Sequence, residues 1–310
     1  MGEATKGFWA MVAASAVWGL SPLYYKLLVA VPPLEVLSHR TLWSLVFFVV
    51  VLAAQRRLAG LWSALSGRDA RGGGPAVIAL AAVMISLNWF VFIWSVQNGH
   101  TVEASLGYFL FPLVAVALGV LVLGEGLRRA QGVAVAMAAL AVALLSWGLG
   151  AAPWIALLLA VSFGLYGLVK KRLALSPVLS VAAEVLLLAP LALTWLAVAE
   201  WRGAGAFGRE IGLSLLLAFS GVLTGGPLLL FSYAARRVRM STLGLVQYLN
   251  PSLQFLCAVV VFAEPFGLWH RLAFGLIWSA LLIYSAASLG QPKAVTSRDS
   301  SVATSGTASR

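Results

Sequence analysis

Residues 108–125 read YFLFPLVAVALGVLVLGE, and no charged side chain interrupts this run before Glu125 at its end. A helix needs about 20 apolar residues to cross the hydrocarbon core of a bilayer, and residues 102–107 lengthen the run to that size. Backbone N–H and C=O groups cannot be left unpaired in hydrocarbon, so such a run must pair them internally. The stretch therefore predicts a membrane-spanning helix.

The composition of the whole chain extends this prediction. Of the 310 residues, 61% are hydrophobic and only 10% are charged, whereas a soluble domain averages about 25% charged residues. Ten apolar runs are expected to form helices, roughly at residues 8–30, 36–54, 75–96, 102–123, 130–147, 153–169, 178–199, 211–233, 240–262 and 268–289. We therefore predict an all-α membrane protein with ten transmembrane helices and no soluble catalytic domain.

A second stretch repeats the first. Residues 247–264 read QYLNPSLQFLCAVVVFAE, with Pro251 thirteen residues before Glu264, as Pro112 is before Glu125. The offset between the two stretches is 139 residues, about half of the helical region. The spacing favours an internal repeat.

The repeat divides the chain into two five-helix halves. Residues 8–147 and 148–289 form the halves, after a cytoplasmic N-terminus at 1–7 and before a polar tail at 290–310 that we expect to be disordered. Because five is odd, the second half must enter the membrane from the opposite side. Such inverted-topology repeats are typical of transporters that alternate between outward and inward states.

Basic residues predict the orientation. If the N-terminus is cytoplasmic, sixteen of the 21 Lys and Arg residues fall on the cytoplasmic side of the membrane. Because cytoplasmic loops are enriched in Lys and Arg, this distribution predicts that both termini lie in the cytoplasm. The same distribution explains the net charge of +11 without nucleic acid. The sixteen are Lys6, Arg56, Arg57, Arg68, Arg71, Arg128, Arg129, Lys170, Lys171, Arg172, Arg236, Arg237, Arg239, Lys293, Arg298 and Arg310.

Ionisable residues inside a membrane are costly and are therefore functional candidates. Glu35, His39 and Arg40 cluster early in the second helix, where either a substrate pathway or structural ion pairing explains them. Glu103 opens the fourth helix, where an acid also suits the positive end of the helix dipole. Glu184 lies in an apolar run with no basic neighbour in sequence, and serves either in proton coupling or in packing.

The binding site is expected where equivalent elements of the two halves meet, at Tyr108–Pro112 and Gln247–Pro251. Each proline removes one helical hydrogen bond and frees a carbonyl one turn earlier, although both prolines could instead only bend their helices for packing. Asn88 could line this cavity or join two helices. The candidate substrate-binding residues are Tyr108, Phe109, Tyr166, Gln247, Tyr248, Asn250, Asn88 and Trp89. Their side chains suit a flat, amphipathic organic solute.

Other chemistries lack their signatures in this sequence. No GxxxxGK[ST] loop is present to bind nucleotide, and no HExxH or Asp-rich site is present to hold a metal. Cys257 is the single cysteine, so no disulfide can form within the chain. We therefore predict no cofactor, no metal and no catalytic residues.

Four segments resemble one family closely. They are WGLSPLYYK (18–26), LEVLSHRTLWS (34–44), NWFVFIWSVQNGHTVEASLGYFLFPL (88–113) and STLGLVQYLNP (241–251). These segments resemble the RarD proteins, in the EamA branch of the drug/metabolite transporter superfamily. The resemblance covers residues 8–289 and implies a bacterial inner-membrane permease of five plus five helices with both termini inside.

The leading functional hypothesis is thus a secondary transporter of small organic solutes or drugs, which works by alternating access and is not an enzyme. Its partners would be a small-molecule substrate and the lipid bilayer, with a homodimer left open. Two alternatives remain: a membrane-embedded enzyme acting on a lipid-linked substrate, and a non-transporting scaffold or sensor. The enzyme would require a cluster of Asp, His or Ser at one interface, which the sequence lacks.

Overall fold

The computed structural model describes residues 2–66, 74–124, 126, 129–150, 153–170, 173, 175–238 and 240–289, and within them every regular element is helical. The elements are α1 (Glu3–Leu27), α2 (Pro33–Ala54), α3 (Leu58–Leu65), α4 (Gly74–Gln97), α5 (Thr101–Leu123), α6 (Arg129–Leu149), α7 (Trp154–Lys170), α8 (Pro177–Trp201), α9 (Ile211–Ala235), α10 (Met240–Gln247), α11 (Leu249–Leu256), the π-helical η2 (Cys257–Val261) and α12 (Leu268–Leu289).

The prediction of an all-α membrane protein is confirmed. Among the described residues, seven helices are long and apolar enough to cross a membrane, namely α2, α4, α5, α6, α8, α9 and α12. The other three predicted ranges coincide with α1, with α7 and with the run from α10 to η2, which are not among those seven. Ten spans therefore remain a prediction. Short α3 lies between two predicted helices and was not expected.

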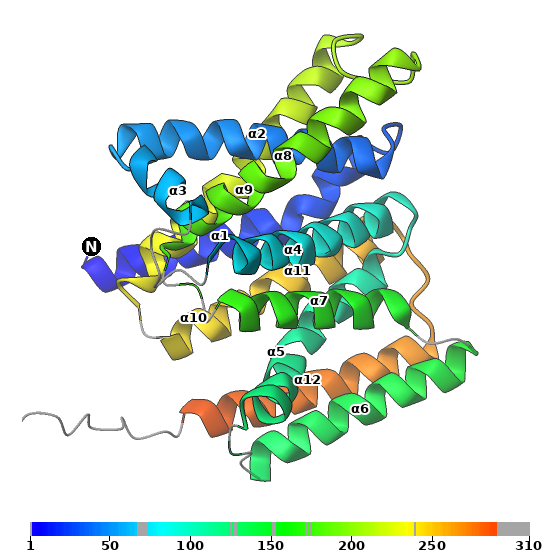
Figure 1. Ribbon diagram of the computed structural model, residues 1–310. Helices are drawn as coiled ribbons and strands as arrows, with labels where there is room; N and C mark the ends of the chain where they lie inside the picture. The colour runs from blue at the N-terminus through cyan, green and yellow to red at the C-terminus, as the bar shows by residue number, and fades with distance from the viewer. Residues whose placement is uncertain are drawn as a thin grey trace, which may run out of the picture.

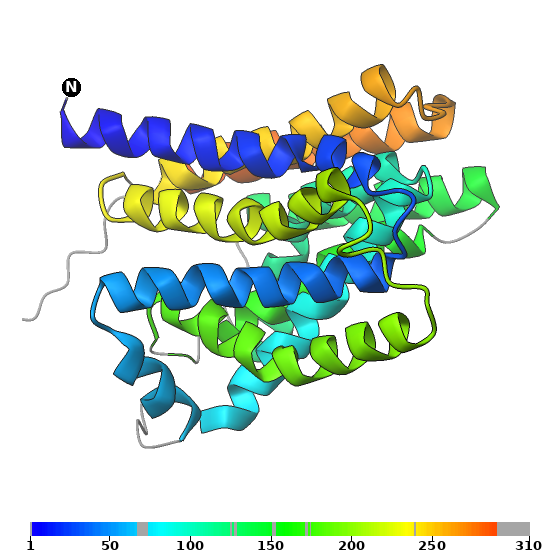
Figure 2. The same ribbon diagram turned by 90° about the horizontal axis from the view of Figure 1, so that it is seen from above.

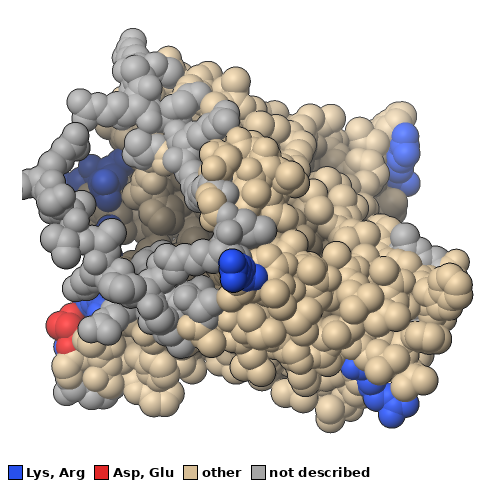
Figure 3. All heavy atoms as spheres, turned by 90° about the horizontal axis from the view of Figure 1, so that it is seen from below, with Lys and Arg blue, Asp and Glu red and all other residues tan. Residues whose placement is uncertain are grey.

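The outer surface of the bundle is apolar, as contact with lipid requires. Leu121, Trp147, Trp201 and Ile211 are each more than 80% exposed, which would be unfavourable in water for side chains of this size. On the face seen in Figure 3, the surface formed by the described residues is mostly uncharged, and Lys, Arg and a small group of Asp or Glu atoms occur in a few places.

The helices pack in pairs that join distant parts of the chain. Helix α6 lies along α12, α5 packs on α7, α2 packs on α8 and α9, and α1 packs on α9 and α11 (Figures 1 and 2). The start of α1 and the end of α12 lie at the same end of the bundle (Figure 1). We call this the N-terminal end, and the end that holds the start of α5 the far end.

Two glycines allow helices from the two halves to approach closely. A Cβ on Gly19 of α1 would lie 2.7 Å from Cβ of Leu253 on α11, and one on Gly164 of α7 would lie 3.3 Å from Cγ1 of Val114 on α5. Both distances are shorter than an ordinary van der Waals contact, so a side chain at either position would force its neighbour to shift. The pairs α1–α11 and α7–α5 are the ones that an internal repeat would relate.

The ninth predicted helix differs from the expectation of one continuous run over 240–262. The chain forms α10, breaks at Tyr248 and continues as α11 and then η2. Pro251 is the third residue of α11, where its missing N–H would have had no partner in that helix anyway. Pro112, in contrast, lies inside the continuous α5.

Several sequence predictions concern residues outside the described part. They include Glu125, which the repeat pairs with Glu264, the tail at 290–310, and the basic residues Arg68, Arg71, Arg128, Lys171, Arg172, Arg239, Lys293, Arg298 and Arg310.

Candidate functional site

A cavity of about 800 Å³ lies in the centre of the bundle, with walls from every helical element except α3 and η2. At the N-terminal end its lining includes Gly126, Pro177 and Leu245, which are exposed at the surface. Deeper in the bundle it is lined by Tyr25 and Arg40, which are 2% and 7% exposed. The cavity thus opens toward the N-terminal end and closes inside the protein.

Most of the candidate binding residues border this cavity. It is lined by Tyr108, Tyr166, Gln247, Tyr248, Asn250, Asn88 and Trp89, together with Arg40 from the pathway group. Phe109 is placed elsewhere: its ring packs against Phe274 and Trp278 with centroids 5.8 and 6.0 Å away. Glu35, His39, Glu103 and Glu184 do not line the cavity.

Asn88 both borders the cavity and joins three helices. Its Nδ2 donates to the Leu159 carbonyl and to Ser162 Oγ of α7, each at 3.0 Å. Its Oδ1 accepts from the Tyr108 hydroxyl of α5 at 2.9 Å. The two roles weighed for Asn88 from sequence are therefore compatible, because the amide holds Tyr108 in place at the cavity wall.

Arg40 projects from α2 into a pocket of aromatic and hydroxyl groups. Its Nε donates to Thr224 Oγ1 at 3.0 Å and its Nη1 to the Tyr25 hydroxyl at 2.7 Å. The guanidinium carbon lies 4.0 Å from the centroid of the Trp89 ring, a cation–π distance. These contacts fix the orientation of the guanidinium without neutralising its charge.

Glu184 has a basic partner that its neighbours in sequence do not supply. The Lys170 Nζ of α7 lies 2.5 Å from Glu184 Oε1, and Tyr166 and Ser180 donate to the same carboxylate at 3.0 and 2.9 Å. Lys170 also donates to Ser180. The Glu184 side chain is fully buried, whereas Lys170 and Tyr166 line the cavity. Glu184 thus contacts the cavity wall through its partners.

Sequence reasoning omitted some cavity residues. Lys170 was assigned to the cytoplasmic charge count, and Trp18 and Thr224 were not singled out. Gln254 of α11, one turn beyond Asn250, also lines the cavity, and its Nε2 donates to Asn250 Oδ1 at 2.8 Å. Thr224 and Trp18 carry no signal in a single sequence, because apolar helices show no polar face from which to orient them.

Side chains that accept backbone N–H groups close the far end of the bundle. The Glu264 carboxylate accepts from the N–H groups of Thr101 and Val102 at 2.9 and 2.8 Å, and so caps α5. Glu35 Oε1 accepts from the Ala206 N–H at 2.6 Å. Both contacts join one half of the chain to the other.

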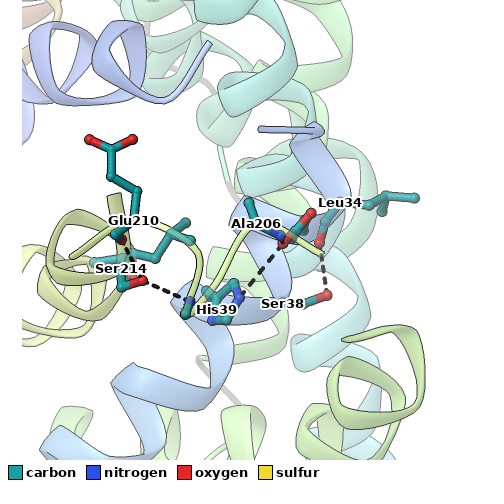
Figure 4. A network of polar contacts seen from close by, with 10 residues as sticks. Leu34, Ser38, His39, Ala206, Glu210 and Ser214 are labelled. Carbon is teal, nitrogen blue, oxygen red and sulfur yellow. Dashed lines mark hydrogen bonds and ion pairs between the residues drawn. The ribbon is translucent and has the colours of Figure 1, made fainter. Parts of the chain in front are cut away.

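His39 belongs to the same closed end. Figure 4 shows it near Ala206, and its Nε2 is 4.0 Å from Glu35 Oε1. The imidazole stacks on Phe207 with ring centroids 4.9 Å apart. His39 Nε2 is buried and forms no hydrogen bond with another described residue. At the start of α5, Glu103 Oε2 lies 3.5 Å from His100 Nδ1.

A multi-pass helical bundle with a large central cavity open at one end is the architecture of a membrane transporter. Comparison with known proteins identifies the class further. The model of the EamA-like transporter family matches this chain twice, at residues 5–147 and 151–286. The chain belongs to that family, within its RarD branch.

Relatives are similar over nearly the whole chain. Protein RarD of Streptomyces exfoliatus is 46% identical, covering 87% of this chain and 85% of that protein. The uncharacterized transporter YojE of Bacillus subtilis is 42% identical, over 91% and 94% of the two chains. Protein RarD of Escherichia coli is 41% identical over the same shares. A solved crystal structure, 21% identical, shares the fold with a TM-score of 0.59 over 91% of this chain and 98% of that one.

Proposed function

We propose that this protein is a secondary transporter of the bacterial inner membrane that moves small organic solutes through its central cavity by alternating access. The observation that carries the proposal is the cavity itself, which opens at the N-terminal end and is closed at the far end. Its volume of about 800 Å³ lies within the usual range of small-molecule sites, about 300–1,000 Å³.

The proposed mechanism requires two halves that can exchange conformations. Three observations support an inverted repeat of residues 8–147 and 148–289. The family model matches once in each half. Close glycine contacts occur in both of two helix pairs that the repeat relates, α1 with α11 and α7 with α5, as they also do between α2 and α9 and between α6 and α12. Helices from both halves line the cavity.

In the conformation described, the proposed transporter faces the side of the membrane that holds the N-terminus. By the distribution of basic residues that side is the cytoplasm, so this state would be inward-open. Opening the far end would require the contacts of Glu264 and Glu35 across the two halves to break. We propose those two carboxylates as part of the outer gate, with His39 packed beside Glu35.

The solute would be bound by aromatic faces and amide groups. Tyr108, Tyr166 and Trp89 provide aromatic surface, and Gln247 and Asn250 provide hydrogen-bonding groups. If transport is proton-coupled, Glu184 is the candidate proton site, because it is buried and reaches the cavity through Lys170 and Tyr166.

Transport is tested with purified protein in proteoliposomes, with and without a pH gradient, against a panel of labelled organic solutes. We expect saturable flux of at least one solute, which is absent from protein-free vesicles. The variants Tyr108→Phe and Gln247→Leu should alter affinity or selectivity at normal expression. Flux indistinguishable from empty vesicles for every solute would contradict the proposal, and unchanged affinity in both variants would move the site elsewhere.

A further inference from the structure

Arg40 is a buried cation at the deep end of the cavity, and it forms no ion pair with a carboxylate of the described residues. Arg40 and Lys170 are the charged residues among the described residues that line the cavity. Lys170 is paired with Glu184 at 2.5 Å, but Arg40 has only the hydroxyls of Tyr25 and Thr224 as hydrogen-bond partners. Within the described part of the chain, the cavity wall therefore carries one positive charge that no neighbouring acid balances.

The seven acidic residues that the structure describes lie away from the cavity wall, and several of them interact with other groups. Glu184 binds Lys170, Glu35 accepts from Ala206, and Glu264 caps α5. None of the seven lines the cavity. The full set is Glu3, Glu35, Glu103, Glu184, Glu200, Glu210 and Glu264.

The guanidinium also has unused donors. Of its five N–H groups, the one on Nε and one on Nη1 donate to Thr224 and Tyr25. The remaining three form no hydrogen bond with described residues, although Arg40 is only 7% exposed. A cation–π contact with Trp89 offsets only part of the cost of burying a cation. A bound anion would balance the positive charge of Arg40 and would accept hydrogen bonds from its remaining N–H groups.

We propose that the transported solute carries a carboxylate that binds Arg40, and that its aromatic body lies against the rings along the cavity. A carboxylate matches the forked N–H groups of a guanidinium and neutralises one charge, which is the charge available here. A phosphate dianion would leave a negative charge without a partner, because Lys170 is held by Glu184. Phe92, Tyr108 and Phe163 supply a continuous run of ring contacts, with Tyr108 5.6 and 6.0 Å from the other two.

This inference rests on the proposed transport function and adds the chemical class of the solute. It is tested by titration calorimetry of the full chain in nanodiscs with matched pairs of probes. One pair is 3-phenylpropionate and 3-phenylpropanamide, and the other is indole-3-acetate and indole-3-acetamide. Phenyl phosphate is the third type of probe.

We expect wild-type protein to bind each acid more tightly than its amide. Arg40→Gln should weaken binding of the acids by roughly tenfold to a hundredfold, because a charge-assisted hydrogen bond is lost, and leave the amides little changed. Arg40→Lys should keep part of the preference, since it keeps the charge but not the fork. Arg271→Gln is the matched control, because Arg271 is exposed and does not line the cavity.

Retained binding of the amides shows that Arg40→Gln is folded. Equal affinity of the wild-type protein for acids and amides, failure to bind any acid, or an acid preference that survives Arg40→Gln would overturn the inference. Tighter binding of phenyl phosphate than of the carboxylates would overturn it in favour of a phosphate. None of these outcomes bears on the transport proposal, which the flux of solutes tests separately.

Discussion

Breaking the buried pair of Lys170 and Glu184 gives the sharpest test of the packing around the cavity. In Lys170→Met, a fully buried carboxylate would lose its cation and keep only the hydroxyls of Tyr166 and Ser180. Removing one partner of a buried ion pair typically costs about 3–5 kcal/mol. Because Lys170 is 22% exposed and two hydrogen bonds remain, we expect the lower end, about 3 kcal/mol.

The double variant Lys170→Met/Glu184→Gln should recover most of this loss. It removes the uncompensated charge and keeps an acceptor for Tyr166, so the loss should be about 1 kcal/mol and the coupling between the two sites about 2 kcal/mol or more. The free energy of unfolding is measured by titration with sodium dodecyl sulfate in mixed micelles, followed by tryptophan fluorescence.

Lys6→Met is the matched control for the buried pair. It breaks a Lys6–Glu3 pair at 2.8 Å in which both side chains are about half exposed or more. Water screens such a pair, so the loss should be far smaller. A Lys170→Met loss as small as that of the control, or a double variant whose loss equals the sum of the two single ones, would refute the assignment of a buried ion pair.

Further outcomes follow from other contacts. Glu264→Gln should destabilise the protein by about 1–3 kcal/mol in the same titration, since a charged cap of α5 is lost. Glu210→Gln is the control and should leave the free energy of unfolding nearly unchanged, because the Glu210 side chain forms no cap hydrogen bond at the start of α9. Gly107→Val should destabilise the protein by about 1–3 kcal/mol, because a Cβ at this position would lie 2.8 Å from the Ala156 carbonyl oxygen. Gly167→Val is the control and should destabilise the protein less, because a Cβ on Gly167 meets nothing within 4 Å. A C-terminal alkaline phosphatase fusion should be inactive and a green fluorescent fusion bright; an active phosphatase would overturn the orientation.

The sequence predicted the helices well, since charge-free runs of this length leave few alternatives to helix. It also brought Tyr108 and Gln247 to one cavity, because prolines at corresponding positions marked both segments. It could not supply the partner of Glu184. Lys170 is fourteen residues away on another helix, and its contact depends on how α7 and α8 pack, which local sequence does not encode.

The sequence also did not predict how each helix is rotated about its own axis. The sequence grouped Arg40 with Glu35 and left a substrate pathway and structural ion pairing both open. In the structure Arg40 lies at the cavity wall, whereas Glu35 accepts from the Ala206 N–H. Helices that are apolar all round have no stripe that shows which face is buried. The spacing of Glu264 from Pro251 indicated a repeat, yet its capping of α5 depends on a contact 162–163 residues away in sequence.

The break between α10 and α11 makes the two halves unequal, and this bears on energetics. In a transporter built from an inverted repeat whose halves had identical sequences, exchanging the conformations of the halves would convert the inward state into an outward state of the same free energy. Here one half has an unbroken α5 and the other has a broken helix that ends in a π-helical turn. Because the two segments also differ in sequence, YFLFP at 108–112 and QYLNP at 247–251, the proposed exchange would join two states of unequal free energy. A gap of even 1.4 kcal/mol would bias an empty transporter about tenfold toward one side. A solute would then be met more often on that side, before any ion gradient is applied.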